Sequence, residues 1–335
     1  MDRIKGLKEY IREPEYRKAL GLPQEVIEEY SLLAQGEYNI NYLFDHPVTK
    51  RKLLLRVNCG SQMHLDNQIE YEAAALEYLK FSGRTPEVYY VDGSKEFLDH
   101  GILVEDYLKG RVLDYKRDLK KAARILADIH STKIPAENHL IKPDNPLQAI
   151  LEECEDMFSV YMASDLGDTE KKVQIRRMLD KGFESLKNTN LKDGYQCLIN
   201  TELNSTNFLI DGDGKDYLID WEKPVYGDPA QDIAHFLAPT TTFWKTDVIL
   251  SSEEVEEFIG EYIEAVKGRF PVEGLRDRVY TYIPITCLRG ITWCAMAWIQ
   301  YQQPDKMIFN ESTFRKLEAY LSNDFLGDIE DEKYK

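Results

Sequence analysis

The spacing of the hydrophobic residues changes once along this chain of 335 residues, close to residue 109. Before that point, short runs rich in β-branched and aromatic residues are separated by Gly, Asn and Pro, which is typical of strands. After it, apolar residues recur every three or four positions, as on one face of a helix. The change predicts a small strand-rich domain at residues 1–108 and a larger, mainly helical domain at residues 109–335.

The first domain is expected to contain five strands of one sheet and a single helix. The strands are predicted at residues 30–33, 42–44, 53–58, 87–92 and 101–108. Residues 66–81 carry apolar side chains at helical spacing, and Gly83 and Pro86 end that helix.

The second domain is expected to be a set of helices interrupted once by short strands. The helices are predicted at residues 118–130, 146–163, 169–187, 253–267, 276–301 and 311–322. The strands lie in the segment 197–220, which includes the stretch INTELNSTNFLI. A sheet followed by a helical lobe is an α+β arrangement, and we expect a ligand in the cleft between the two lobes.

The balance of charges narrows the choice of partner. The chain has 59 acidic and 42 basic residues, so its net charge of -17 argues against nucleic acid or an anionic membrane as the main partner. No segment approaches the roughly 20 apolar residues of a membrane span, and the charged N-terminal stretch is unlike a signal peptide. We therefore expect a cytoplasmic protein, whose oligomeric state the sequence does not indicate.

The cysteines and histidines do not form a metal-binding pattern. The five cysteines include no C-x-x-C pair, and the six histidines are scattered along the chain, so a zinc site is not expected. A metal in this protein would be a hard cation bound by carboxylate and amide oxygens.

Three features of the first domain need a common explanation. The turn that begins at Gly36 carries Asn39 between two predicted strands, where the backbone could fold over a phosphate, although a turn of this composition is usually a simple hairpin. Arg56 is a charge in the apolar strand LLLRVN, which also fits an edge strand facing water. Glu72, or with less support Glu70, lies on the following helix and could pair with Arg56 or face solvent.

The fourth feature is the strand-rich segment of the second domain. Glu202 and Asn207 lie in its polar loop, and Asp220 ends the apolar run YLID. Asn207 and Asp220 occupy comparable positions at strand ends and could converge on one cation, although ordinary turn chemistry would place the same residue types there. Taken in order, the four features match the arrangement of groups that kinase-like folds use for phosphoryl transfer.

The chain resembles the aminoglycoside phosphotransferase and choline kinase-like family, whose fold is that of the protein kinases. The resemblance covers roughly residues 25 to 300 and is most specific in LIDWEKPVYGDPAQDIAHF at 218–236. The stretches GEYNINYLF, LLLRVN, EAAAL, VEDYLKGRVL and LADIH also look like parts of the family pattern. The resemblance implies a bilobal fold with a small antiparallel sheet, and transfer of a phosphate from ATP or GTP to a hydroxyl of a small molecule.

The resemblance also implies a role for each candidate residue. Asp220 and Asn207 would bind Mg²⁺ at the terminal phosphates, and Arg56, held by Glu72, would neutralise the α- and β-phosphates. The phosphates would be covered by the backbone of Gly36, Glu37, Tyr38 and Asn39. The adenine would be bound by the backbone around Glu105, Asp106 and Tyr107. Asp228 and Asp232 would brace the catalytic loop and the start of the next helix.

The catalytic loop departs from the family pattern at its most important position. The family has H-G-D-x-x-x-x-N, whereas this chain has Asn200, Thr201 and Glu202 in the same frame before Asn207. Glu202 keeps the acidity needed to accept a proton from the acceptor hydroxyl, but its extra methylene moves the carboxylate by about 1 Å. Either Glu202 still reaches the hydroxyl, or the protein is a catalytically impaired nucleotide-binding module.

Glu202 is also the residue that separates the two hypotheses. A carboxylate open toward the phosphate site favours activity, and one held in a structural salt bridge favours the binding module. The acceptor is expected to be a small molecule, with an amine or a sugar as candidates. Aromatic residues that could line its site are Phe243, Trp244, Tyr280, Tyr282, Trp293, Trp298 and Tyr301.

Overall fold

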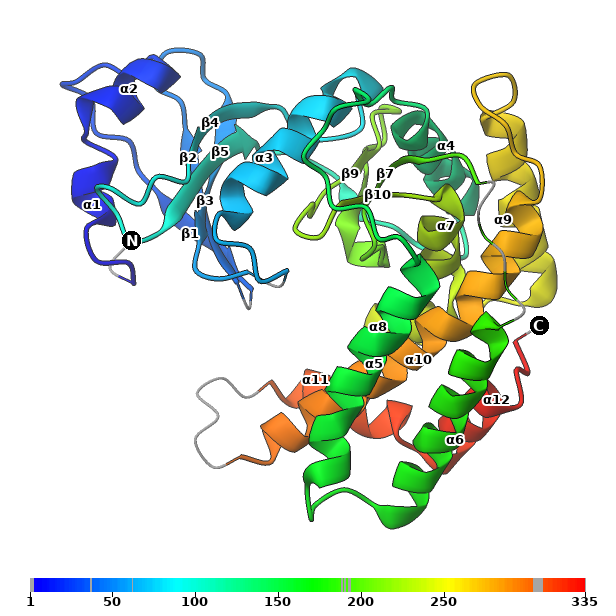
Figure 1. Ribbon diagram of the computed structural model, residues 1–335. Helices are drawn as coiled ribbons and strands as arrows, with labels where there is room; N and C mark the ends of the chain where they lie inside the picture. Colours follow the sequence, from blue (N-terminus) through cyan, green and yellow to red (C-terminus); the bar gives the residue numbers. More distant parts are fainter. Residues whose placement is uncertain are drawn as a thin grey trace. The chain divides into compact units, whose positions relative to one another are not determined.

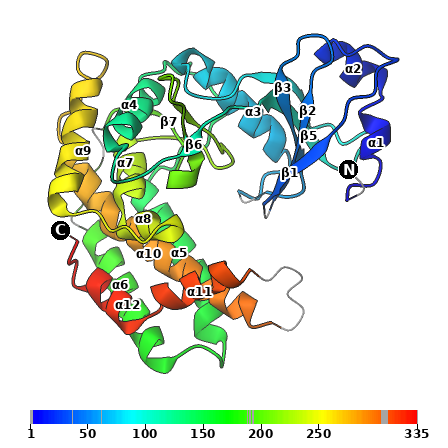
Figure 2. The same ribbon diagram turned by 180° about the vertical axis from the view of Figure 1, so that it is seen from behind.

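The computed structural model describes residues 3–334, except residues 37, 62, 188, 190, 192, 193 and 304–309. The chain divides into two compact units, and each unit is assembled from three separate segments. The first unit contains residues 1–113, 128–141 and 207–225, and the second contains residues 114–127, 142–206 and 226–335. Both units are drawn in Figures 1 and 2, and the α+β class is confirmed.

The first unit is built on a five-stranded antiparallel sheet with the strand order β1-β2-β3-β5-β4. Its strands are β1 (Ser31–Gln35), β2 (Asn39–Asp45), β3 (Lys52–Asn58), β4 (Val88–Asp92) and β5 (Gly101–Asp106). All five predicted strands are therefore present. The edge-strand interpretation of Arg56 is wrong, because β3 lies between β2 and β5 and Arg56 is only 6% exposed.

The two faces of this sheet are covered by different elements because side chains alternate along a strand. Leu53, Leu55 and Val57 of β3 pack in one hydrophobic core with residues of α1 (Leu7–Tyr10) and α2 (Pro14–Leu20). Arg56 has the opposite parity and contacts α3 (Gln68–Leu79) on the other face. Figure 2 shows α1 and α2 on one side of the sheet and α3 on the other.

A short β-rich segment completes the first unit. The strands β6 (Arg111–Val112), β8 (Phe208–Ile210) and β9 (Tyr217–Leu218) form a three-stranded antiparallel sheet in the order β6-β8-β9. Phe208 pairs with Leu218, and the N–H of Ile219 donates to the carbonyl of Asn207 at 2.9 Å. This pairing fixes the backbone of Asn207 beside the residue that precedes Asp220.

The second unit is mainly helical, and helix α10 packs against several of its other helices. The predicted helices are found, within a few residues, as α5 (Pro146–Ala163), α6 (Thr169–Leu186), α9 (Ser252–Ala265), α10 (Leu275–Tyr301) and α11 (Glu311–Tyr320). The helices α7 (Pro229–Leu237), α8 (Pro239–Lys245) and α12 (Asn323–Glu330) were not predicted. The predicted helix at 118–130 is α4 (Leu119–His130), and β7 (Cys197–Ile199) pairs with β10 (Val225–Gly227).

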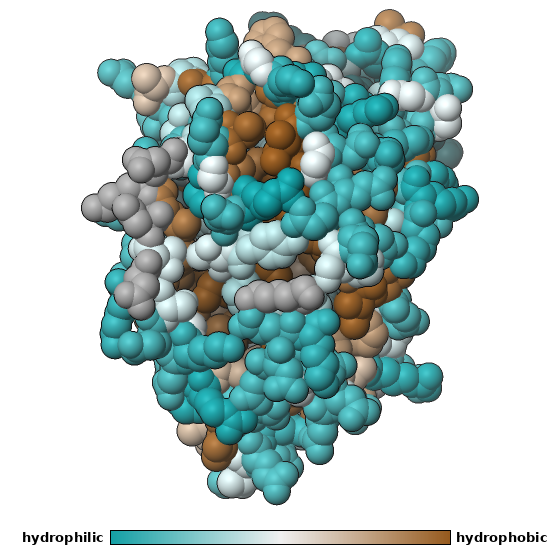
Figure 3. Space-filling model, turned by 90° about the vertical axis from the view of Figure 1, so that its right-hand side faces the viewer, coloured by the Kyte–Doolittle hydropathy of each residue, from teal (hydrophilic) through white to brown (hydrophobic). Residues whose placement is uncertain are grey.

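Hydrophilic residues predominate on the face drawn in Figure 3, where the hydrophobic residues lie mostly in hollows between them. Within the described part of the chain, no helix has the length and apolar composition needed to cross a membrane.

Candidate active site

Arg56 lies at the centre of a buried group of carboxylates in the first unit. Its Nη1 donates to Oε1 of Glu72, and its Nη2 lies 3.5 Å from Oε1 of Glu105. Glu222 is the third acidic contact, with Oε1 3.9 Å from Nη1. The side chains of Arg56, Glu72 and Glu105 are 7%, 1% and 5% exposed, so solvent screens these charges weakly.

The electrostatics of the group leave an excess of negative charge. Burial acts to lower the pKa of Arg56, but the carboxylates of Glu72, Glu105, Asp220 and Glu222 outweigh it and hold the pKa above its ordinary value. Burial raises the pKa of Glu72 and of Glu105, and the Arg56 guanidinium only partly offsets that rise. One permanent cation therefore faces four acidic side chains, and a further cation bound nearby would be stabilised.

Helix α3 presents Glu72 to Arg56 because it is tied to the segment that follows Asp220. Gln68 donates from Nε2 to the carbonyl of Glu222 at 2.7 Å, and the Tyr71 hydroxyl donates to the carbonyl of Pro224 at 2.7 Å. Glu70, the weaker candidate, is exposed in the first turn of the helix, where its N–H donates to the capping side chain of Asn67.

The turn between β1 and β2 approaches the same group. The N–H of Gly36 donates to the carbonyl of Asn39 at 2.9 Å, which closes the turn. The Asn39 side chain donates to Oε1 of Glu222 and accepts from Nδ2 of Asn58 at 3.0 Å. Tyr38 accepts from the N–H of Cys59 at 2.7 Å. Glu37, the remaining candidate in this turn, lies outside the described residues.

The end of β5 uses part of its backbone within the sheet. The N–H of Asp106 donates to the carbonyl of Glu87 at 3.0 Å, and the N–H of Tyr107 donates to the carbonyl of Lys52 at 3.2 Å. Two of the N–H groups considered for adenine binding are therefore already engaged. Glu105 contributes its side chain instead, since it lies on the same sheet face as Arg56.

The two candidate metal ligands have donor atoms that suit a hard cation. Asn207 is 6% exposed and offers an amide oxygen, and Asp220 offers a carboxylate. Asp220 has a φ of 68°, a left-handed conformation that non-glycine residues adopt mainly at turns and functional sites. The described residues contain no group of three or more His, Cys, Asp or Glu side chains arranged to bind a metal. Two oxygen ligands fit Mg²⁺, which binds few protein groups and completes its shell with phosphate and water.

A buried aspartate accepts hydrogen bonds from the backbone of the loop that carries Glu202. Asp232 is fully buried and accepts the backbone N–H groups of Asn200 at 2.8 Å and Thr201 at 2.7 Å. The Asn200 side chain in turn accepts the N–H of Glu202 at 3.0 Å. Asp228 caps α7 by accepting from the N–H of Ala230 at 2.8 Å. The contacts are those expected of residues that brace the loop and the next helix.

Replacing Asp232 with alanine is expected to destabilise the protein by about 3 kcal/mol or more, because it strands two buried backbone donors that now bind a carboxylate. Chemical denaturation measures the change. Asp232→Asn, which keeps one acceptor oxygen, should lose less than Asp232→Ala. Equal stability of Asp232→Ala and the wild type would contradict the bracing role.

Glu202 itself is part of an ion-paired triad within the second unit. Its Oε1 accepts from Nη2 of Arg289 at 3.0 Å, and Arg289 also donates to Glu153 from Nε at 3.0 Å and from Nη2 at 3.3 Å. The Glu202 side chain is nevertheless 30% exposed. The sequence predicted neither Arg289 nor Glu153 at this position. Glu202 is thus in a salt bridge, as the binding-module hypothesis expects, but it keeps part of its surface open.

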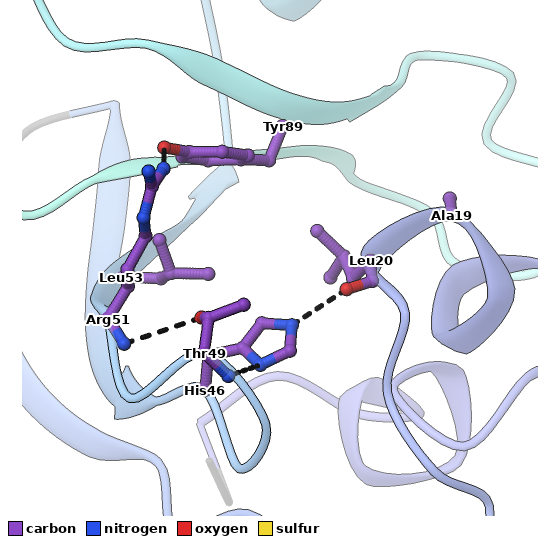
Figure 4. A pocket seen from close by; sticks show the side chains of 7 residues that line it. All are labelled: Ala19, Leu20, His46, Thr49, Arg51, Leu53 and Tyr89. Atoms are coloured by element: carbon purple, nitrogen blue, oxygen red, sulfur yellow. Dashed lines mark hydrogen bonds between the residues drawn. The ribbon is translucent and has the colours of Figure 1, made fainter.

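A separate cavity lies in the first unit, on the sheet face opposite Arg56. Its volume is about 360 Å³, and its lining residues are Ala19, Leu20, His46, Thr49, Arg51, Leu53 and Tyr89. In Figure 4 the imidazole of His46 lies against the end of α2, with Nε2 2.7 Å from the carbonyl of Leu20. Since Leu53 belongs to the core face of β3, this cavity is not part of the Arg56 group.

Two contributors to these groups had a sequence signal that could have been used. Glu222 follows Asp220 by two residues in IDWE, so alternation along an extended segment could have placed both side chains on one side. Arg289 is the only charged residue between Arg278 and Asp305 in an otherwise uncharged helical stretch. A lone cation in such a stretch usually has a buried or functional partner.

The first unit combines an antiparallel sheet, a buried arginine paired with a helical glutamate, and Asn207 and Asp220 next to the strands β8 and β9. This combination is typical of the kinase-like class of phosphotransferases. A model of the phosphotransferase enzyme family matches residues 29–275, which is well over half of the chain. The chain belongs to that family and is an enzyme that phosphorylates a hydroxyl group of a small molecule. A comparison with curated protein sequences finds no significant match.

Solved structures confirm the fold at low sequence identity. A choline kinase from Streptococcus pneumoniae superposes with a TM-score of 0.62 at 20% identity, covering 98% of this chain and 100% of that one. An ethanolamine kinase from Plasmodium vivax superposes with a TM-score of 0.63 at 17% identity, covering 93% of this chain and 88% of that one. A spectinomycin phosphotransferase in complex with ADP and spectinomycin superposes with a TM-score of 0.61 at 14% identity, covering 91% of this chain and 92% of that one. The expected protein kinase-like fold is therefore confirmed.

Proposed function

We propose that this enzyme transfers the γ-phosphate of ATP, or of GTP, to a hydroxyl group of a small molecule that contains an amine or a sugar. The observation that carries the proposal is the group around Arg56, where one guanidinium contacts Glu72, Glu105 and Glu222. The contact of Arg56 with Glu72 supports the pairing of a phosphate-binding cation with a glutamate on the neighbouring helix.

In this proposal Arg56 neutralises the α- and β-phosphates, and Glu72 holds its guanidinium in place. The backbone from Gly36 to Asn39 covers the phosphates. The hydrogen bond of Asn39 to Glu222 would break as the nucleotide enters, and Asn39 would contact the phosphates instead. The adenine binds near Glu105, Asp106 and Tyr107, through groups that the sheet does not use. The solved spectinomycin phosphotransferases bound to ADP and to AMP support a nucleotide in proteins of this fold.

Asn207 and Asp220 would hold Mg²⁺. The charge of the site supports this assignment, because a nucleotide phosphate entering a group with four carboxylates and one arginine would otherwise be repelled. A Mg²⁺ ion held by Asn207 and Asp220 would supply positive charge to neutralise the negative charge that develops during transfer.

Glu202 would orient the acceptor hydroxyl and accept its proton. Its partly exposed carboxylate supports that role, and its loop is fixed by the backbone contacts to Asp232. Among the aromatic candidates, Trp293 is exposed and packs edge-to-face on Trp244, so this pair could contact an acceptor. Phe243 is partly buried and instead packs on the buried side chains of Tyr320 and Phe325. The acidic net charge and the choline and ethanolamine kinases of similar fold favour an amine-bearing acceptor.

The salt bridge of Glu202 with Arg289 is the observation that favours the alternative, a nucleotide-binding module with impaired transfer. In that case Arg289 would withhold the carboxylate from an acceptor. The two hypotheses differ in what the removal of the Glu202 charge does to turnover.

Replacing Glu202 with glutamine is expected to lower phosphate transfer by about a hundredfold, since positioned proton transfer contributes at least that much. Nucleotide affinity should not change, because no proposed nucleotide contact involves Glu202. The measurement is Mg²⁺-dependent transfer from ATP and GTP to a panel that includes choline, ethanolamine, aminoglycosides and sugars, with nucleotide affinity determined in parallel.

The matched control is Glu184→Gln, which changes an exposed glutamate of the same unit and should behave as the wild type. A wild type that binds no nucleotide would contradict both hypotheses. Nucleotide binding without transfer to any acceptor, with Glu202→Gln indistinguishable from the wild type, would favour the impaired module. Loss of activity in Glu202→Asp would show that the acceptor site is built for the longer side chain.

A further inference from the structure

Helix α10 carries one charged residue in the long stretch between Arg278 and Asp305, and that residue reaches the catalytic loop. Arg289 binds Glu153 of α5 through two of its nitrogens, Nε and Nη2, and the same Nη2 also donates to Glu202. A guanidinium is planar, so a carboxylate bound at two of its nitrogens fixes its plane. Glu153 thereby determines where Arg289 holds the carboxylate of Glu202.

The backbone on both sides of Arg289 is closely packed, which makes the position of the guanidinium precise. A Cβ added to Gly290 would lie 2.7 Å from Cβ of Thr240 in α8, so the two helices approach without room for a side chain. A Cβ added to Gly182 of α6 would lie 3.0 Å from the buried side chain of Leu288. Helix α10 therefore cannot shift at this point without moving its neighbours.

The backbone near Glu153 on α5 and the loop that carries Glu202 are also held in place. Cys154, which follows Glu153, is fully buried between the helices. The backbone of the Glu202 loop is fixed through Asn200 and Thr201, and Thr201 has the left-handed φ of 68°. The side chains of the triad thus connect elements that packing and hydrogen bonds already fix.

A glutamate at the position of the family aspartate has one more rotatable bond and is harder to orient. Ordering a glutamate side chain costs conformational entropy, because several rotatable bonds must be fixed. An ion pair with a fixed guanidinium restricts the carboxylate before the acceptor arrives, so this cost is not added to the barrier for transfer. The longer side chain and the arginine on α10 are then two parts of one arrangement.

We propose that Arg289, anchored by Glu153, is a positioning residue that holds the carboxylate of Glu202 in the orientation needed to engage the acceptor hydroxyl. The proposal rests on the proposed role of Glu202 in transfer. It gives the salt bridge a function in turnover, where the alternative hypothesis makes it an obstacle.

The test compares kcat and the KM for nucleotide of Arg289→Gln, Arg289→Lys and Glu153→Gln with those of the wild type, at saturating acceptor and varied nucleotide. Arg289→Gln is expected to lower kcat by about ten- to a hundredfold, the cost of misplacing a catalytic group by about 1 Å, with the KM for nucleotide unchanged. Arg289→Lys keeps the charge without the planar fork and should fall between Arg289→Gln and the wild type. Glu153→Gln, which weakens only the anchor, should lower kcat by about tenfold or less.

A double substitution separates positioning from a general structural role. If Arg289 acts through Glu202, adding Arg289→Gln to Glu202→Gln should cause no further loss, whereas independent effects would multiply. Arg276→Gln is the matched control, because Arg276 lies on the same helix and pairs with the exposed Glu256, and its kcat should equal that of the wild type.

The outcomes distinguish failure of the positioning role from failure of the proposed function. An active wild type with an unchanged kcat in Arg289→Gln would overturn the positioning role and leave the proposed function standing. The same loss from Arg289→Gln in the wild-type and the Glu202→Gln backgrounds would also overturn it, since the effect would then be structural. A kcat higher in Arg289→Gln than in the wild type would show that the arginine obstructs Glu202. A wild type that transfers phosphate to no acceptor would overturn the proposed function and this inference together.

Discussion

Replacing Asp220 with asparagine is expected to reduce phosphate transfer by about a thousandfold, the upper end of what loss of one group that stabilises developing charge costs. The protein should still fold, because asparagine is well tolerated at the left-handed φ of 68° that this residue adopts. The substitution removes one charge from the acidic group around Arg56 and leaves the shape of the side chain nearly unchanged.

The binding of nucleotide gives the sharper measurement. In the wild type, nucleotide should bind more tightly with Mg²⁺ than with a chelator, because the cation offsets the carboxylates. In Asp220→Asn the two affinities should converge. Asp213→Asn, at an exposed turn before β9, is the control and should keep the full dependence on Mg²⁺. An undiminished gain of affinity from Mg²⁺ in Asp220→Asn would show that Asp220 does not bind the metal.

Replacing Arg56 with methionine is expected to lower the free energy of unfolding by about 3–5 kcal/mol and to lower transfer by about a hundredfold or more. The loss of stability comes from Glu72 and Glu105, which would remain buried without their cation. Chemical denaturation and steady-state kinetics measure the two effects. Arg51→Met on the neighbouring turn is the control, because the Arg51 side chain is 57% exposed and its removal should change little.

The stability of Arg56→Met should also depend on pH in a defined direction. Burial already raises the pKa of Glu72, and Arg56 is the main group that lowers it. Without Arg56 the folded state holds protons that the unfolded state releases, so the stability deficit should shrink as the pH falls from about 8 to about 6. Adding Glu72→Gln should recover part of the stability but none of the activity. A deficit that grows as the pH falls would contradict the assignment of these charges.

The sequence predicted the strands from their β-branched and aromatic residues, and the helices from a periodicity that extends over many residues. The five strands of the sheet, helix α3 and the long helices of the second unit were all found close to their predicted bounds. Helices α1 and α2 were missed because they have only four and seven residues, too few for a helical period to be recognised among charged side chains. Their stability comes from packing on the core face of the sheet.

The candidate site was predictable where one motif carries several residues and not where it depends on strand register. The pairing of Arg56 with Glu72 followed from the order of strand and helix and is present in the structure. Glu105 was predicted to bind adenine through its backbone, yet its side chain contacts Arg56. The register of β3 and β5 pairs Leu54 with Glu105 and Arg56 with Leu103, which puts Glu105 and Arg56 on the same face of the sheet. A single sequence does not determine that register. Arg289 is separated from Glu202 by 87 positions, so only the packing of α10 brings them together.

The division of both units into three segments has a consequence for how the chain is made and handled. During synthesis at about 5–20 residues per second, the sheet emerges early, but its unit lacks residues 207–225 until most of the protein has been translated. During that interval Arg56 would have Glu72 and Glu105 as partners, but Asp220 and Glu222 would not yet have been synthesised. For the same reason, no single cut in the gene separates the two units. A chain truncated after residue 113 would contain the five-stranded sheet but lack β8 and β9, which belong to the same unit.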